Sequence, residues 1–191
     1  DSDQSILANY VTLNPVKSGV VGNATDKAIE RRAWLLLDLD PVRPTKLNST
    51  ESQLGAAREL AQKLTGHLTA AGWPTPMQVM SGNGIHLYYP VAQDVQDTTF
   101  EHVLDTISQE FTNSQVEVDP TVSNRSRVTK VPGTMSRKGP HSNDRPWRRA
   151  VLEAYSDGQP LSEAQLTEYL REHARVPVKH VQSVAASTKK R

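Results

Sequence analysis

The sequence lacks cysteine, long apolar runs and the phosphate-binding loop, and each absence excludes a class of protein. Without cysteine, the 191 residues cannot build a disulfide framework, a thiolate zinc site or a cysteine nucleophile. No run of about 18 apolar residues is present to span a bilayer, and no signal-peptide pattern opens the chain. The loop pattern of NTP-hydrolysing motors is missing as well. With 36% hydrophobic residues, we expect one compact domain and no membrane partner.

The charges are nearly balanced in sum but not in position. The chain has 22 basic and 21 acidic residues, yet residues 124–149 hold eight basic residues against one acid. These eight are Arg125, Arg127, Lys130, Arg137, Lys138, Arg145, Arg148 and Arg149. Basic runs are often solvated faces, but one on an otherwise acidic chain favours a polyanionic partner such as nucleotide phosphates or nucleic acid.

Hydrophobic periodicity predicts strands at 34–40, 77–81, 84–90 and 115–119. A helix at 51–71 has a capping box at Thr50 and Gln53, and a second helix, ending near Phe111, has a similar box at Thr98 and Glu101. The resulting order, β-α-β-β-α-β, is the split βαβ or ferredoxin-like arrangement, so the expected fold class is α/β (α+β).

Further elements extend this core, which covers about residues 33–119. Strands are predicted at 9–13, 127–131 and 149–153, and a helix at about 161–174 opens with a Ser162–Gln165 box. We expect a single domain over residues 1–175, with 176–191 as a linker or tail, cut from a longer protein.

Two acids in the first core strand are candidates for a metal site. Residues two apart in a strand share a face, so Asp38 and Asp40 project together while Leu35, Leu37 and Leu39 face the helices. Carboxylate oxygens that leave room for water and phosphate suit Mg²⁺ or Mn²⁺. The alternative is a pair of turn-forming acids at a strand end.

The segment from Ser81 to His86 should lie beside this pair. The first and third strands of a split βαβ are antiparallel neighbours, which brings the end of one next to the start of the other. Glycines at 82 and 84 permit close approach of a phosphate, Ser81 offers a hydroxyl, and His86 faces the same side as the acids. The alternative for His86 is a structural histidine.

Four motifs together resemble the archaeo-eukaryotic primase superfamily, and more narrowly the primase-polymerase domains of phage and plasmid replication proteins. They are Asp38-Leu39-Asp40, residues 81–86, the pair Val118-Asp119, and residues 124–134. The resemblance covers roughly residues 10–153 and implies two-metal nucleotidyl transfer with Mg²⁺ or Mn²⁺.

The resemblance also assigns roles to single residues. It implies Asp38, Asp40 and Asp119 as metal-binding carboxylates, and Ser81, Gly84, His86, Arg127 and Lys130 as nucleotide contacts. We add Lys138 from the same basic run. In an ideal sheet, however, the strand that Asp119 ends is antiparallel to the first core strand and spans about 17 Å at roughly 3.3 Å per residue. Asp119 is therefore expected at the end of the sheet away from Asp38 and Asp40, too far to share an ion with them.

The expected activity is synthesis or extension of primers on a single-stranded DNA template from NTPs or dNTPs. A helicase, if any, would belong to another part of the parent polypeptide, and the expected location is the cytoplasm of a bacterial, archaeal or phage-infected cell. Two alternatives remain. One is a non-catalytic nucleic-acid-binding module with this sheet, although aromatics for base stacking are few, at 5%. The other is a different palm-type nucleotidyl enzyme.

Overall fold

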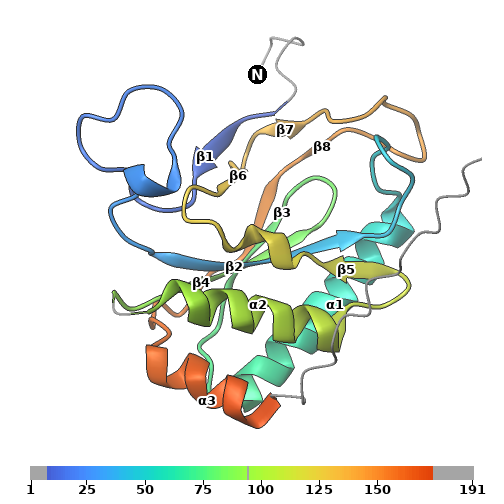
Figure 1. Ribbon diagram of the computed structural model, residues 1–191. Coiled ribbons are helices and arrows are strands. Elements are labelled where there is room, and N and C mark those ends of the chain that lie inside the picture. The colour runs from blue at the N-terminus through green and yellow to red at the C-terminus, as the bar shows by residue number, and fades with distance from the viewer. Residues whose placement is uncertain (1–7, 94, 174–191) are drawn as a thin grey trace, which may run out of the picture.

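A five-stranded antiparallel sheet forms the centre of the molecule in the computed structural model, which describes residues 8–93 and 95–173 (Figure 1). The strand order is β5-β2-β4-β3-β9. The strands are β2 (Trp34–Pro41), β3 (Met77–Met80), β4 (Ile85–Pro90), β5 (Val116–Val118) and β9 (Val151–Ala154). Together with the two helices between them, the first four give the split βαβ, so the predicted fold class is confirmed.

Three helices lie on one side of this sheet: α1 (Glu51–Ala70), α2 (Asp97–Phe111) and α3 (Glu163–His173). The first two pack on the strands, and α3 packs against α2 on the side away from the sheet (Figure 1). An aromatic chain connects α3 to the sheet, since Tyr169 meets Trp73 at 5.3 Å between ring centroids and Trp73 meets Tyr89 at 5.2 Å. All three rings are buried, so α3 belongs to the same core.

Two small ribbons cover part of the opposite face of the sheet (Figure 1). One pairs β1 (Tyr10–Thr12) with β6 (Val128–Lys130), and the other pairs β7 (Met135–Ser136) with β8 (Arg148–Arg149). Two short 3₁₀ helices, η1 (Asp26–Ala28) and η2 (Pro120–Ser123), complete the described elements. The face of the sheet opposite the helices is therefore partly covered, which is why Leu36 and Tyr88 are buried on it.

The helix caps follow the sequence at two of three predicted positions. Thr50 and Gln53 form the expected capping box, and the backbone N–H groups of Ser162 and Gln165 each bond to the other's side chain. The box at Thr98 is wrong: the N-cap is Gln96, two residues earlier, so that α2 begins at Asp97, and Gln96 makes no side-chain cap bond. The Asp97 carboxylate instead accepts hydrogen bonds from Arg32 and Arg125.

The remaining element boundaries agree to within two residues where they can be compared. The predicted end of the last helix, residue 174, and the predicted linker, 176–191, lie outside the described residues. Within residues 8–93 and 95–173, the structure contains no helix with the length and apolarity to cross a bilayer.

Candidate active site

The carboxylates of Asp38 and Asp40 lie on the roofed face of the sheet, near the end of β2. The alternation of β2 places both there, because Leu37 and Leu39 are fully buried on the helix side. The Asp38 side chain is 21% exposed and that of Asp40 is 47% exposed, so one acid is inner and the other outer. The outer acid has a cationic neighbour, Arg43 Nη1, at 3.4 Å from its Oδ1.

Asp119 lies beside Asp38 and not at the far end of the sheet. Its backbone N–H donates to the Asp38 carbonyl over 2.9 Å, one residue beyond the paired positions Val118 and Leu39. The distance argument from the sequence was wrong because β5 has only three residues and its pairing with β2 begins at Pro41. The Asp119 carboxylate caps η2 by accepting from the Thr121 N–H at 2.8 Å.

Burial makes Asp38 an unusual carboxyl. Its pKa is raised from 3.8 to about 6, first by burial and then by the neighbouring charges of Asp40 and Asp119, against the opposing effect of His86. Its Oδ1 is buried and has no hydrogen-bond partner. A buried carboxylate oxygen without a donor is costly for a protein to keep, and an acid so perturbed in a cleft is typical of a functional site.

His86 connects this acid to the roof of the site. Its Nε2 is 3.4 Å from Asp38 Oδ1, within reach of an ion pair but without hydrogen-bond geometry, and its Nδ1 is 2.8 Å from the Tyr88 hydroxyl. That hydroxyl forms a short hydrogen bond with Thr129 of β6. Burial raises the pKa of Tyr88, so its hydroxyl stays protonated and fixes the imidazole from behind while Nε2 faces the acid.

The turn between β3 and β4 is built to approach β2 closely. Gly82 has a φ of +106°, and a Cβ on Gly84 would lie 2.5 Å from the Leu39 carbonyl oxygen and 2.8 Å from Asp40 Oδ1. Gly84 is thus required by the packing of the turn against the carboxylates. The Ser81 hydroxyl already bonds within the turn, to the N–H and the carbonyl of Gly84.

A cleft of about 330 Å³ runs between the end of β2 and the β1–β6 ribbon. Its charged lining comprises the two acids Asp38 and Asp40, His86, and four bases: Arg43, Arg127, Lys130 and Lys138. The cleft gathers seven of the sequence-predicted residues: Asp38, Asp40, Ser81, His86, Arg127, Lys130 and Lys138. The other two, Asp119 and Gly84, contribute from its edge through their contacts with Asp38 and Asp40. A second hollow, of about 320 Å³, shares Asp40, Arg43 and Lys138.

Lys130 is the most buried of these bases, at 3% exposed. Its Nζ donates to the Met135 carbonyl at 2.5 Å and lies 5.5 Å from the ring centroid of Tyr10. Burial, with help from Lys138 and Arg137, lowers the pKa of Lys130 to about 8. A cation held in a buried position without a carboxylate partner suits an anionic ligand.

The other members of the basic run stabilise the fold. Arg125 pairs with Asp97 at 2.8 Å, Arg148 pairs with Glu51 at 2.8 Å, and Arg145 donates to Asn48 and Gln53. Arg149 donates to the Gly133 carbonyl, and Arg137 lies over the Trp147 ring. Some of the basic residues at 124–149 therefore stabilise the fold, and the others line the cleft.

Sequence reasoning missed several residues that line the cleft, among them Arg43 and Thr129. Arg43 follows the acidic pair by three residues and returns to it through the turn after β2. Thr129 reaches the site only because β6 pairs with β1 above the sheet, and no local pattern predicts that pairing.

The carboxylates of Asp38, Asp40 and Asp119 do not form one group of three closely spaced metal ligands. Among the described residues, the single group of three possible metal ligands within 4.8 Å of one another lies elsewhere, on the helices. Asp38 nevertheless offers a buried oxygen that accepts no hydrogen bond, and Asp40 lies on the same face with a half-exposed side chain. This pair fits a hard divalent cation with open positions for water or phosphate.

Comparisons with known proteins give likenesses in structure only. No family model matches the chain, and no curated protein matches it. Among solved structures, the AEP domain of the cyanophage S-2L primase-polymerase is 18% identical, with a TM-score of 0.47 over 83% of this chain and 68% of that one.

Two further solved structures are similar to a comparable extent. The primase RepB′ is 16% identical, with a TM-score of 0.44 over 74% of this chain and 40% of that one. The polymerase domain of Mycobacterium tuberculosis ligase D, in complex with DNA, is 18% identical, with a TM-score of 0.44 over 86% of this chain and 58% of that one. What the comparisons report is a likeness in fold at 16–18% identity.

Proposed function

We propose that this chain is a metal-dependent nucleotidyltransferase domain that adds nucleotides to a primer, or starts one, on a single-stranded DNA template. The observation that carries the proposal is the cleft in which Asp38, Asp40 and His86 face three lysine and arginine side chains from residues 127–138. Acids at one end and bases at the other suit a ligand that combines a divalent cation with phosphates.

Asp38 and Asp40 would hold Mg²⁺ or Mn²⁺, with Asp119 as the third carboxylate. When bound, the two ions would supply activation of a 3′-hydroxyl and stabilisation of the charge that develops on the triphosphate. The Oδ1 of Asp38 supports this assignment, since it is buried and accepts no hydrogen bond, and a cation would compensate its charge.

The protein side chains would bind and orient the nucleotide. Lys130 and Arg127 would contact phosphate oxygens from the roof, and Lys138 would do so from the rim. His86 would donate from Nε2 to a phosphate oxygen, because its other nitrogen is held by Tyr88. Ser81 and Gly84 would act chiefly by holding the turn against β2.

The test is nucleotide incorporation by purified protein with a template, Mg²⁺ or Mn²⁺ and labelled NTPs or dNTPs, with and without a primer. We expect extended products from the wild type and at least a hundredfold less from Asp40→Asn, which keeps the side-chain size but loses the charge. Asp105→Asn, the same change at an exposed acid on α2, is the matched control and should keep most of the activity. Wild-type rates from Asp40→Asn would overturn the assignment.

The same assay distinguishes the two alternative functions. Cyclic products would indicate another palm-type enzyme, and DNA binding without products would indicate a binding module. The burial of Tyr88, at 3% exposed, argues against a module of that kind, because the β1–β6 ribbon covers the ring that would stack on a base.

A further inference from the structure

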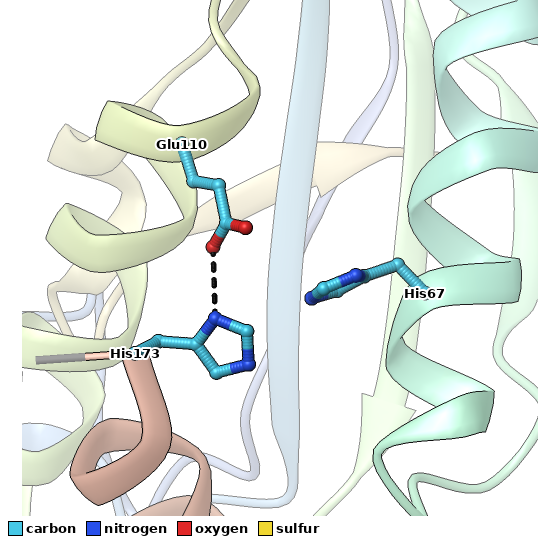
Figure 2. A group of neighbouring side chains, drawn as sticks. All are labelled: His67, Glu110 and His173. Carbon is cyan, nitrogen blue, oxygen red and sulfur yellow. Dashed lines mark hydrogen bonds and ion pairs between the residues drawn. The ribbon is translucent and has the colours of Figure 1, made fainter.

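A second cluster of possible metal ligands lies among the helices, on the other side of the sheet from the cleft. His67 of α1, Glu110 of α2 and His173 of α3 each offer one ligand atom, and these atoms lie within 4.8 Å of one another (Figure 2). Three helices that follow one another along the chain thus each contribute one side chain to a single point.

The contacts within the cluster are incomplete without a further partner. His173 Nδ1 lies 3.1 Å from Glu110 Oε2, whereas His67 Nε2 is buried and has no hydrogen-bond partner. Figure 2 shows the His67 ring pointing from α1 toward the other two side chains. A buried imidazole nitrogen without a hydrogen-bond partner lowers the stability of the fold, and its lone pair is available to a metal.

Aromatic neighbours hold both imidazoles in place. The His173 ring stacks on Tyr169 at 4.3 Å with an interplanar angle of 21°, and the His67 ring meets Phe111 edge-on at 5.0 Å. The Tyr169 hydroxyl is 3.5 Å from Glu110 Oε2. Rings fixed by packing lose little freedom when they bind an ion, so the site is largely preorganised.

We propose that His67, Glu110 and His173 bind a Zn²⁺ ion that fastens α3 to α1 and α2. Two imidazoles and a carboxylate are ligands typical of zinc and unlike those of Mg²⁺. Tetrahedral ligands at about 2.1 Å from zinc lie about 3.4 Å apart, so small side-chain rotations would close the cluster around an ion. The side chains of His173 and Glu110 are 21% and 27% exposed, which leaves an entry path and a fourth position for water.

The first experiment measures the melting temperature of the full chain, free of tag histidines and stripped with a chelator, during titration with Zn²⁺. It is done in the Asp38→Asn/Asp40→Asn background, so that zinc held by the cleft does not contribute. At a zinc concentration about 100 times the Kd, we expect a rise of roughly 5–10 °C with one ion bound per chain. No zinc-dependent shift would overturn the proposal.

Ligand variants then locate the ion. His67→Gln and Glu110→Gln should each abolish most of the shift, while the matched controls His102→Gln on α2 and Glu59→Gln on α1, both exposed, should keep it. A shift that survives in both ligand variants would place zinc elsewhere and overturn the proposal. The metal-free melting temperature checks that each variant folds.

A spectroscopic readout separates binding from packing. Co²⁺ in a tetrahedral site gives strong visible bands, and we expect them in the background protein and not in Glu110→Gln, whose side chain is partly exposed and whose loss the fold should tolerate. If the cluster were only an ion pair between His173 and Glu110, Glu110→Gln would lower the metal-free melting temperature and neither metal would have an effect. That result would also refute zinc binding.

Discussion

Asp38→Asn should make the metal-free protein more stable at neutral pH while it removes activity. Asparagine has the size of aspartic acid but cannot ionise, so it avoids the cost of a buried carboxylate. In the wild type that cost comes first from burial and then from the nearby charges of Asp40 and Asp119. The prediction rests on the proposal that Asp38 serves to bind a metal ion and does not stabilise the fold.

The magnitude comes from the raised pKa. Since the native pKa of Asp38 is about 6 and its ordinary value is 3.8, the folded protein holds this proton more tightly than the unfolded chain does. The contribution of protonated Asp38 to the free energy of unfolding is therefore full below pH 4. It is lost as the pH rises from about 4 to about 6, by about 3 kcal/mol in all. For a domain of this size, that corresponds to a change in melting temperature of roughly 6–12 °C.

The assay is thermal or urea unfolding of wild type and Asp38→Asn, in chelator, from pH 4 to pH 8. We expect similar stability at pH 4 and a more stable variant at pH 8, while Asp105→Asn, an exposed acid on α2, should follow the wild type. Added Mg²⁺ or Mn²⁺ should raise the stability of the wild type and not of the variant. A variant that is less stable than wild type at pH 8 would refute the reasoning.

Three further predictions use the same site. Gly84→Ala should lower the free energy of unfolding by about 1–3 kcal/mol and reduce incorporation, because its Cβ would lie 2.5 Å from a backbone oxygen of β2. Gly66→Ala on α1, where the Cβ meets open space, should raise the free energy of unfolding by about 0.5–1 kcal/mol. Urea unfolding measures both. Lys130 should lose its charge as the pH rises through about 8. In steady-state incorporation, the KM of the wild type for nucleotide should therefore rise about tenfold over this pH range, whereas the KM of Lys130→Arg should not change. His86→Gln should raise KM more than it lowers kcat, and an unchanged KM would count against its phosphate contact.

Much of the site follows from the sequence because strands alternate their faces. The two-residue period puts Asp38 and Asp40 together, and the split βαβ order brings His86 opposite Asp38 in the register of β2 and β4. Both inferences need only local periodicity and one topological rule. The alternation in β4 holds as well, since Ile85 and Leu87 face the helices.

What the sequence could not supply are the contacts that depend on register and on distant pairing. The position of Asp119 depends on which residue of β5 lies opposite Leu39, and a shift of a few residues would separate it from the pair. The bond from Tyr88 to Thr129 depends on β6 pairing with β1, more than 100 residues away along the chain. Neither leaves a local sequence pattern.

The distribution of charge shows why a nearly neutral chain can suit a polyanionic ligand. Arg125, Arg145 and Arg148 are engaged with groups of the fold, so the excess of bases at 124–149 is not all available to a partner. The cleft itself has four bases against two acids, an excess of two positive charges with both acids ionised. That excess is too small to hold a bare triphosphate by charge alone, and the inner acid would repel it. A divalent cation at Asp38 and Asp40 would remove this repulsion and leave the four bases for phosphate oxygens, so ion and nucleotide should bind cooperatively.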